Sequence, residues 1–77
     1  MKQAESFELK YPNITRWVQE QGWIEIGQDD YSRSFLRALT LGGMAWEGRK
    51  KYRSMDEAFR ALDLALKEWM KAEGIPS

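Results

Sequence analysis

The sequence predicts a small α+β domain in the chain order α-β-β-β-α, with a three-stranded antiparallel meander and both helices packed on one face. Three observations predict it. Apolar residues recur at helical spacing over residues 13–21, two apolar runs meet at the Gly42-Gly43 pair, and a capping signature at Ser54 precedes a long amphipathic segment. Because two helices can cover only one face of so small a sheet, the other face is expected to be open.

The composition is that of a chain with a single hydrophobic core and no disulfide bonds. The 77 residues include four Trp, three Phe and three Tyr, a heavy aromatic load that lets a short chain bury enough apolar surface. The chain has no cysteine, which excludes disulfides and thiolate metal sites and suits a reducing compartment. Neither a secretory signal nor an apolar run long enough to span a membrane is present. We therefore expect a soluble, cytoplasmic protein without a membrane partner.

The first helix is predicted over residues 13–21. Residues 1–10 are polar and aperiodic and are expected to form a flexible tail, so the single domain would comprise residues 11–77. Asn13 is the expected N-cap, and Gly22 is expected to end the helix in a left-handed conformation.

Three strands follow. Residues 23–26 form the first, residues 34–41 the second and residues 44–47 the third. The polar segment 28–32 would make the first turn, and Gly42-Gly43 would make the second, with positive φ at both glycines.

This second turn sets the register, and the register assigns side chains to faces. With Leu41 opposite Met44 and Phe35 opposite Ile26, Arg37 falls among apolar neighbours, which calls for a marginal position, a carboxylate partner or a bulge. The predicted core face holds Ile24, Ile26, Phe35, Leu39, Leu41, Met44 and Trp46. The predicted open face holds Trp23, Glu25, Leu36, Ala38, Thr40, Ala45 and Glu47.

The second helix has the clearest signals. Ser54 and Glu57 match a capping box, in which each side chain accepts a hydrogen bond from a free backbone N–H. Gly74 marks the end of the helix. The apolar positions Met55, Phe59, Leu62, Leu66 and Trp69 or Met70, flanked by alanines, define a face wide enough to cover a sheet.

Catalysis has little support in the sequence. Without His or Cys the chain lacks the commonest general base and nucleophile pairs, and no residue is nominated as catalytic, metal-binding or cofactor-binding. Asp29-Asp30 is the one adjacent carboxylate pair, and its position in a hairpin loop favours a solvated turn. We expect a protein that is not an enzyme.

Two surfaces remain as binding candidates. The predicted open face places Trp23 and Glu25 beside Leu36 and Ala38, an apolar surface of the kind that marks contact sites. Packing beneath the N-terminal tail is the alternative for Trp23. The leading hypothesis is a non-catalytic interaction module that uses this face to bind a protein partner or a second copy.

A basic run is the second candidate surface. Arg49, Lys50, Lys51 and Arg53 precede the second helix, where cations and the helix amino terminus together favour a phosphate. A solvated loop is the alternative, because the chain carries 12 basic and 12 acidic residues and Asp56 and Glu57 follow directly.

The element order and the stretch 34–70 resemble the double-stranded RNA-binding domain family. The matching features are the run 35–41, the glycine hairpin, Glu47-Gly48, and Ser54 before an alanine- and leucine-rich helix. This resemblance implies an α-β-β-β-α fold and RNA binding. The family's Lys-Lys-x-Ala-Lys motif is replaced by residues 55–59, Met-Asp-Glu-Ala-Phe, so RNA binding is disfavoured and would rest on residues 49–53. Residues 22–27, together with the Gly42-Gly43 hairpin and residues 46–48, are also similar to small cyanobacterial proteins of unknown function, which implies a compartment but no activity.

Overall fold

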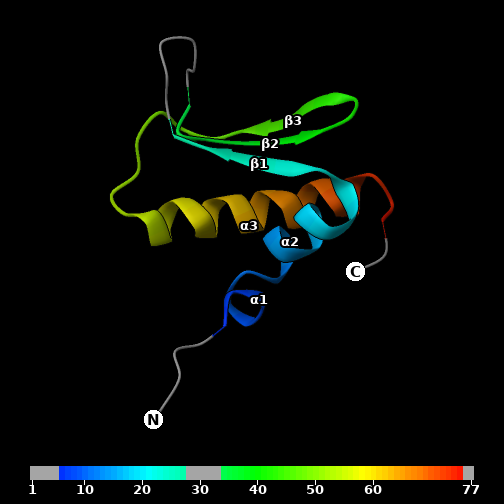
Figure 1. Ribbon diagram of the computed structural model, residues 1–77, viewed down its shortest axis with the longest axis horizontal. Coiled ribbons are helices and arrows are strands. Elements are labelled where there is room, and N and C mark those ends of the chain that lie inside the picture. Colours follow the sequence, from blue (N-terminus) through cyan, green and yellow to red (C-terminus); the bar gives the residue numbers. More distant parts are fainter. Residues whose placement is uncertain (1–5, 28–33, 76–77) are drawn as a thin grey trace.

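The structure is a computed structural model, and it describes residues 6–27 and 34–75. It has the predicted α+β class, with a three-stranded antiparallel meander in the order β1-β2-β3. The strands are β1 (Trp23–Ile26), β2 (Leu36–Thr40) and β3 (Gly43–Glu47), and the long helix α3 (Met55–Ala72) packs on one face. Figure 1 shows the sheet edge-on, with the described helices all below it.

The N-terminal helical region differs in part from the prediction. It comprises α1 (Phe7–Lys10), α2 (Pro12–Arg16) and η1 (Trp17–Gln21), a π-helical turn that continues α2. Asn13 is the second residue of α2 rather than its N-cap. Residues 7–10, which belong to the predicted tail, form α1, and the Phe7 ring packs 5.1 Å from the Tyr11 ring, centroid to centroid. Residues 1–5 of the predicted tail lie outside the described residues.

Gly22 ends this helical region, but not in the predicted left-handed conformation. Its φ is −178°, which is extended backbone. A glycine is needed here for a different reason, since a Cβ atom would lie 1.8 Å from the carbonyl oxygen of Leu39. The close approach of this turn to β2 is therefore what excludes a side chain.

The sheet register differs by one residue from the prediction. Ile26 lies opposite Leu36 rather than Phe35, and the same shift places Glu25 opposite Arg37. Because side chains alternate between faces along a strand, a shift of one residue moves every side chain of β2 to the other face while β1 keeps its assignment.

The β2–β3 hairpin explains the shift. Thr40 pairs with Gly43, so the turn consists of Leu41 and Gly42, and of the two glycines only Gly43 has positive φ, at +124°. A bulge between Ala38 and Leu39 then changes the register again, so that Met44 faces Leu39. The predicted Gly42-Gly43 turn with two positive φ angles is wrong.

As a result, the two faces carry different residues from those predicted. Leu36 and Ala38 were expected on the open face, but both are fully buried beneath the helices. Leu39 and Met44 were expected in the core, but they pair with each other on the open face. Trp46 keeps its predicted place, since it lies opposite Ala38 and packs against the core.

The core lies between the sheet and the helices. Trp17 is fully buried, and its ring meets that of Trp69 edge-on, with ring centroids 4.9 Å apart. The remaining buried core residues are Tyr11, Ile14, Leu36, Ala38, Ala58, Leu62, Leu66 and Met70. The apolar face predicted for α3 is thus confirmed at its centre, whereas Met55 is exposed.

The ends of α3 largely follow the prediction. Ser54 is the N-cap, and its hydroxyl oxygen accepts a hydrogen bond from the N–H of Glu57 at 3.0 Å. The Glu57 carboxylate accepts from the N–H of Arg53, one residue earlier than a capping box requires. Gly74 follows the helix with φ +76°. No helix within residues 6–27 and 34–75 is both long and apolar enough to cross a membrane.

Candidate functional site

The open face of the sheet carries two rows of side chains that cross all three strands. Trp23, Leu39 and Met44 form an apolar row. Next to it, Glu25, Arg37 and Glu47 form a charged row. Cross-strand neighbours on one face contact each other directly, so each row is a continuous strip.

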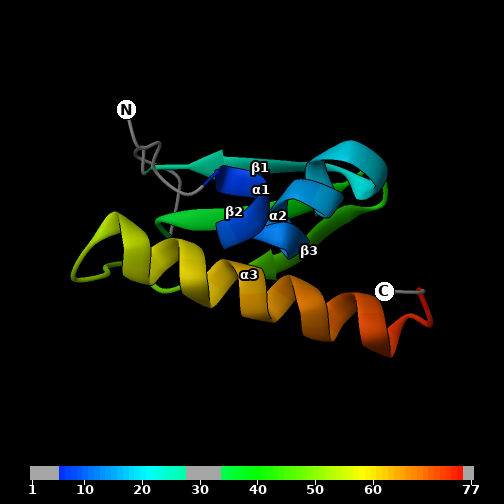
Figure 2. The same ribbon diagram turned by 90° about the horizontal axis from the view of Figure 1, so that it is seen from below.

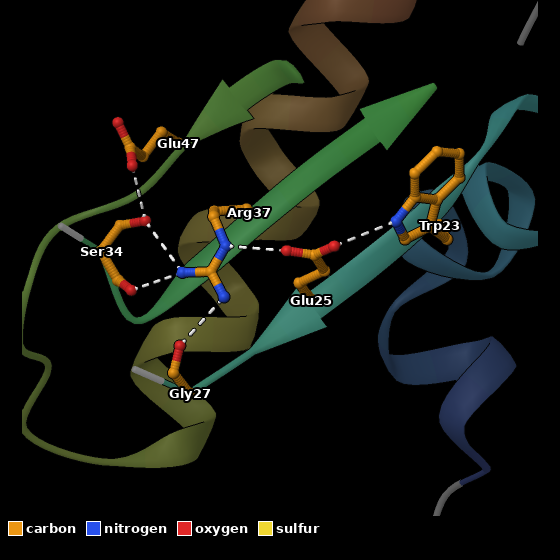
Figure 3. A network of polar contacts seen from close by, with 6 residues as sticks. All are labelled: Trp23, Glu25, Gly27, Ser34, Arg37 and Glu47. Carbon is orange, nitrogen blue, oxygen red and sulfur yellow. Dashed lines mark hydrogen bonds and ion pairs between the residues drawn. The ribbon is translucent and has the colours of Figure 1, made fainter. Parts of the chain in front are cut away.

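Arg37 is the centre of the charged row (Figure 3). Its Nε donates to Glu25 Oε1 at 3.1 Å and its Nη2 donates to the Gly27 carbonyl at 3.0 Å. Its Nη1 donates to the Ser34 carbonyl at 2.7 Å and to the Ser34 hydroxyl at 3.3 Å. The Ser34 hydroxyl in turn donates to Glu47 at 2.9 Å. The guanidinium therefore ties both ends of the β1–β2 loop to the sheet.

Trp23 stands at the edge of this network. Its indole Nε1 donates to Glu25 Oε2 at 3.3 Å, and its backbone carbonyl accepts a hydrogen bond from the buried Trp17 indole at 3.2 Å. The residue is nevertheless 41% exposed. Because Arg37 donates to Glu25 and Glu25 accepts from the indole nitrogen, these two hydrogen bonds fix the orientation of the Trp23 ring on the open face.

Of the four predicted contact residues on this face, Trp23 and Glu25 lie on it and Leu36 and Ala38 do not. The last two are buried under α3, so they are unavailable to a partner in this fold. Prediction from the sequence missed Arg37, Leu39 and Met44 as members of this face. The misfit of Arg37 in an apolar set was the available signal, since a charged residue there is better explained by the opposite register.

The basic loop brings three of its four cations to one place. Arg49, Lys51 and Arg53 line a shallow, open pocket of about 500 Å³ together with Tyr52 and Glu57. The Arg49 guanidinium lies 4.8 Å from the centre of the Tyr52 ring. The backbone N–H of Arg49 donates a hydrogen bond to the Tyr52 hydroxyl. Lys50 instead lines a neighbouring pocket.

Glu57 offsets part of this positive charge. Its carboxylate lies 3.4 Å from Arg49 Nη2 and also accepts the N–H of Arg53. The backbone N–H of Glu57 already donates a hydrogen bond to the Ser54 hydroxyl. Fewer backbone donors at this end of α3 are therefore free to bind a phosphate than the sequence predicts.

A third polar cluster joins α1 to α3. The Tyr11 hydroxyl donates to Asp56 Oδ1, and Lys10 Nζ lies 2.8 Å from the same oxygen. Arg60 Nε lies 2.8 Å from the other carboxylate oxygen. The hydrogen bond from Lys10, followed by that from Tyr11, lowers the pKa of the Asp56 carboxyl from its ordinary 3.8 to about 2. All three partners donate to the Asp56 carboxylate, so this cluster links α1 and the residue after it to α3.

Because the chain has neither His nor Cys, a cluster of carboxylates is the remaining kind of potential metal site. Across residues 6–27 and 34–75, no three potential His, Cys, Asp or Glu ligands come together. Asp29 and Asp30 lie outside the described residues. Buried side-chain nitrogen and oxygen atoms in the same ranges all have hydrogen-bond partners.

Comparison with known proteins identifies no relative. No protein-family model matches the chain, and searches of curated proteins and of solved structures find no significant match.

Proposed function

We propose that this protein is a non-catalytic interaction module that binds a protein partner through the open face of the sheet. The observation that supports this function is Trp23, a large aromatic side chain that is 41% exposed and held in place by Glu25. Protein interfaces are enriched in Trp, Met and Arg, and Met44 and Arg37 lie on the same face as Trp23, with Leu39 directly opposite it. A cytoplasmic setting, which suits a chain without cysteine, belongs to the same proposal.

The charge of the face indicates the chemistry of the partner. Arg37 is only 11% exposed in its side chain, whereas the Glu25 side chain is 47% exposed and Glu47 is also exposed. Solvent therefore meets mainly carboxylates beside the apolar row. The complementary surface is an apolar side chain flanked by Lys or Arg. Two copies packed face to face would bring like carboxylates together, so a basic partner is favoured over a homodimer.

Peptide display against the wild-type chain tests this proposal. We expect selected peptides to combine an aromatic or aliphatic residue with Lys or Arg, and to lose at least about tenfold in affinity for Trp23→Ala. Leu64→Ala is the matched control, because Leu64 is 61% exposed on α3, away from this face. Acidic peptides, or equal binding to the Trp23 variant, would contradict the proposal. If light scattering shows that the wild type is a dimer and that Trp23→Ala is a monomer, the partner at this face is a second copy of the chain and not a basic peptide.

Weak binding to double-stranded RNA is a second candidate, carried by the gathering of Arg49, Lys51 and Arg53 around one pocket. Phosphate contacts from such cations supply most of the non-specific affinity for nucleic acid. The family resemblance of the element order supports the same reading. Glu57 within the pocket weakens it, which is why it ranks second.

Salt-dependent binding to duplex RNA tests this second candidate. The double variant Lys50→Glu/Lys51→Glu should abolish binding, whereas Arg60→Glu, which reverses a 70% exposed charge on α3 outside the basic loop, should leave binding largely intact. Equal affinity of these two variants would exclude the basic loop as an RNA site.

A further inference from the structure

A groove lies on the helical side of the molecule, between α2 and the last turns of α3. Figure 2 shows α2 and α3 side by side beneath the sheet, with the chain turning back after α3. The groove has a volume of about 500 Å³, within the range of small-molecule sites. Its lining includes Asn13, Arg16, Lys67, Met70, Lys71 and Ile75.

The floor of the groove is apolar because of how α3 ends. The N–H of Ile75 donates to the Met70 carbonyl at 2.9 Å, and the N–H of Gly74 donates to the Lys71 carbonyl at 3.1 Å. These two bonds form a Schellman motif, in which the residue after the left-handed glycine turns back onto the helix. Ile75 is therefore held beside the buried Met70 and packs against the core.

The rim of the groove is basic. Lys67 and Lys71 lie one turn apart on α3, and Arg16 reaches the groove from α2. Neither lysine forms an ion pair with any residue in 6–27 or 34–75, and no carboxylate lines the groove. Glu20 lies 3.2 Å from Arg16 and balances that one charge, so the two lysines supply the net positive charge.

The position of Asp63 accounts for the free charge of Lys67. Asp63 lies four residues before Lys67 on α3, the spacing at which an acid normally pairs with a lysine. Here both carboxylate oxygens instead accept hydrogen bonds from the start of α2, namely from Asn13 and Ile14. The acid that would neutralise the lysine is thus used to hold the two helices together.

We propose that this groove binds a small organic anion with an apolar body, such as an alkyl phosphate or carboxylate. The anionic group would lie between Lys67 and Lys71, and the apolar body would cover Ile75. Of the two basic sites in the described structure, this one fits an anion better, because Glu57 lines the loop pocket and no carboxylate lines the groove.

Titration of the ¹⁵N-labelled protein with three probes tests the site. The probes are hexyl phosphate, inorganic phosphate and hexanol, which separate the anionic group from the apolar body. Hexyl phosphate should shift the amide signals of Lys67, Lys71 and Ile75. It should bind at least about tenfold more tightly than inorganic phosphate, since each buried methylene contributes a factor of about four. Hexanol should bind more weakly than hexyl phosphate.

Charge variants complete the test. Lys67→Glu/Lys71→Glu should weaken hexyl phosphate binding by more than about tenfold, and added salt should weaken binding to the wild type. Arg60→Ala, which removes a 70% exposed cation elsewhere on α3, is the control and should bind like the wild type. The variant Lys67→Gln/Lys71→Gln, which adds no repulsion, should also lose affinity. Shifts centred on another surface, unchanged affinity in both α3 variants, or equal affinities for hexyl phosphate and inorganic phosphate would overturn the proposal.

Discussion

The Asp63 carboxylate on α3 accepts a hydrogen bond from the backbone N–H of Ile14 on α2, at 2.9 Å. The same oxygen accepts the N–H of Asn13 at 2.8 Å. Tyr11, the residue at the N-cap position of α2, makes no capping bond with its side chain. One helix therefore caps the other, and the short α2 depends on α3 for the partners of its first backbone donors.

Replacing Asp63 with alanine should lower the free energy of unfolding by about 1–2 kcal/mol, the usual cost of losing a helix cap. Urea denaturation followed by circular dichroism measures the change. Asp63→Asn keeps an acceptor and should cost less. Glu68→Ala removes an exposed carboxylate further along α3; it serves as the control and should cost little. Equal costs for Asp63→Ala and Glu68→Ala would mean that the cap contributes nothing.

Gly22 should tolerate no side chain. In Gly22→Ala the new methyl group would overlap the Leu39 carbonyl, so the turn must move away from β2, and we expect a loss of at least about 2 kcal/mol. Gly42→Ala is the matched control, because its Cβ would meet only the Thr40 hydroxyl at 3.5 Å and its φ is not positive. Thermal unfolding of the two variants should differ clearly. A Gly22→Ala protein as stable as Gly42→Ala would show that this close approach does not constrain the fold.

Local signals were sufficient for some elements of the fold. Trp23–Ile26 occupies the predicted range of the first strand, and Ser54 and Gly74 bound α3 as predicted. In each case the deciding residues lie within a few positions of one another. Capping, turn and alternation rules operate on that scale, so the sequence is enough to apply them.

The open face could not be derived in the same way. Its composition depends on whether the hairpin turn uses Gly42-Gly43 or Leu41-Gly42, a choice of one residue that reverses the faces of β2. The bulge beside Leu39 does not change the alternation of apolar and polar residues in the sequence, so that alternation cannot predict it. The contacts of Asp63 with α2 span about fifty residues of sequence, so no local pattern indicates them. Trp23 and Glu25 were predicted on the correct face because the register shift changed the faces of β2 and left those of β1 as predicted.

Stability should fall in acid through Asp56. Its folded pKa of about 2 lies below its ordinary 3.8, because Lys10 and then Tyr11 donate hydrogen bonds to the charged carboxylate. The unfolded chain therefore takes up the proton first, and the stabilisation present above about pH 4 is lost as the pH falls toward 2. Asp56→Asn should be less stable than the wild type at pH 7, and the difference should shrink over this range. A constant difference between pH 7 and pH 2 would contradict the assignment.

The same cluster predicts the opposite trend in alkali. The hydrogen bond to Asp56, followed by burial, raises the pKa of the Tyr11 hydroxyl above its ordinary 10.0. A raised folded pKa means that the stabilisation is complete below about pH 10 and is lost as the pH rises through the folded value. Tyr11→Phe lacks the hydroxyl and should lose less stability between pH 9 and 11 than the wild type, measured by urea midpoints. Parallel losses in both proteins would exclude Tyr11 as the source.

Arg37 should matter more to stability than its ion pair with Glu25. Only one of its contacts goes to that carboxylate, which is 47% exposed, and the others reach the carbonyls of Gly27 and Ser34 and the Ser34 hydroxyl. An exposed ion pair contributes less than about 1 kcal/mol, whereas a mostly buried guanidinium that joins two chain segments contributes about 1–3 kcal/mol. Arg37→Ala should therefore cost clearly more than Glu25→Ala in urea denaturation.

Arg37→Lys keeps the charge but cannot span these acceptors, so it should resemble Arg37→Ala. Arg60→Ala removes a 70% exposed side chain and should be nearly neutral. If Arg37→Ala and Glu25→Ala cost the same, the ion pair alone would account for the role of Arg37.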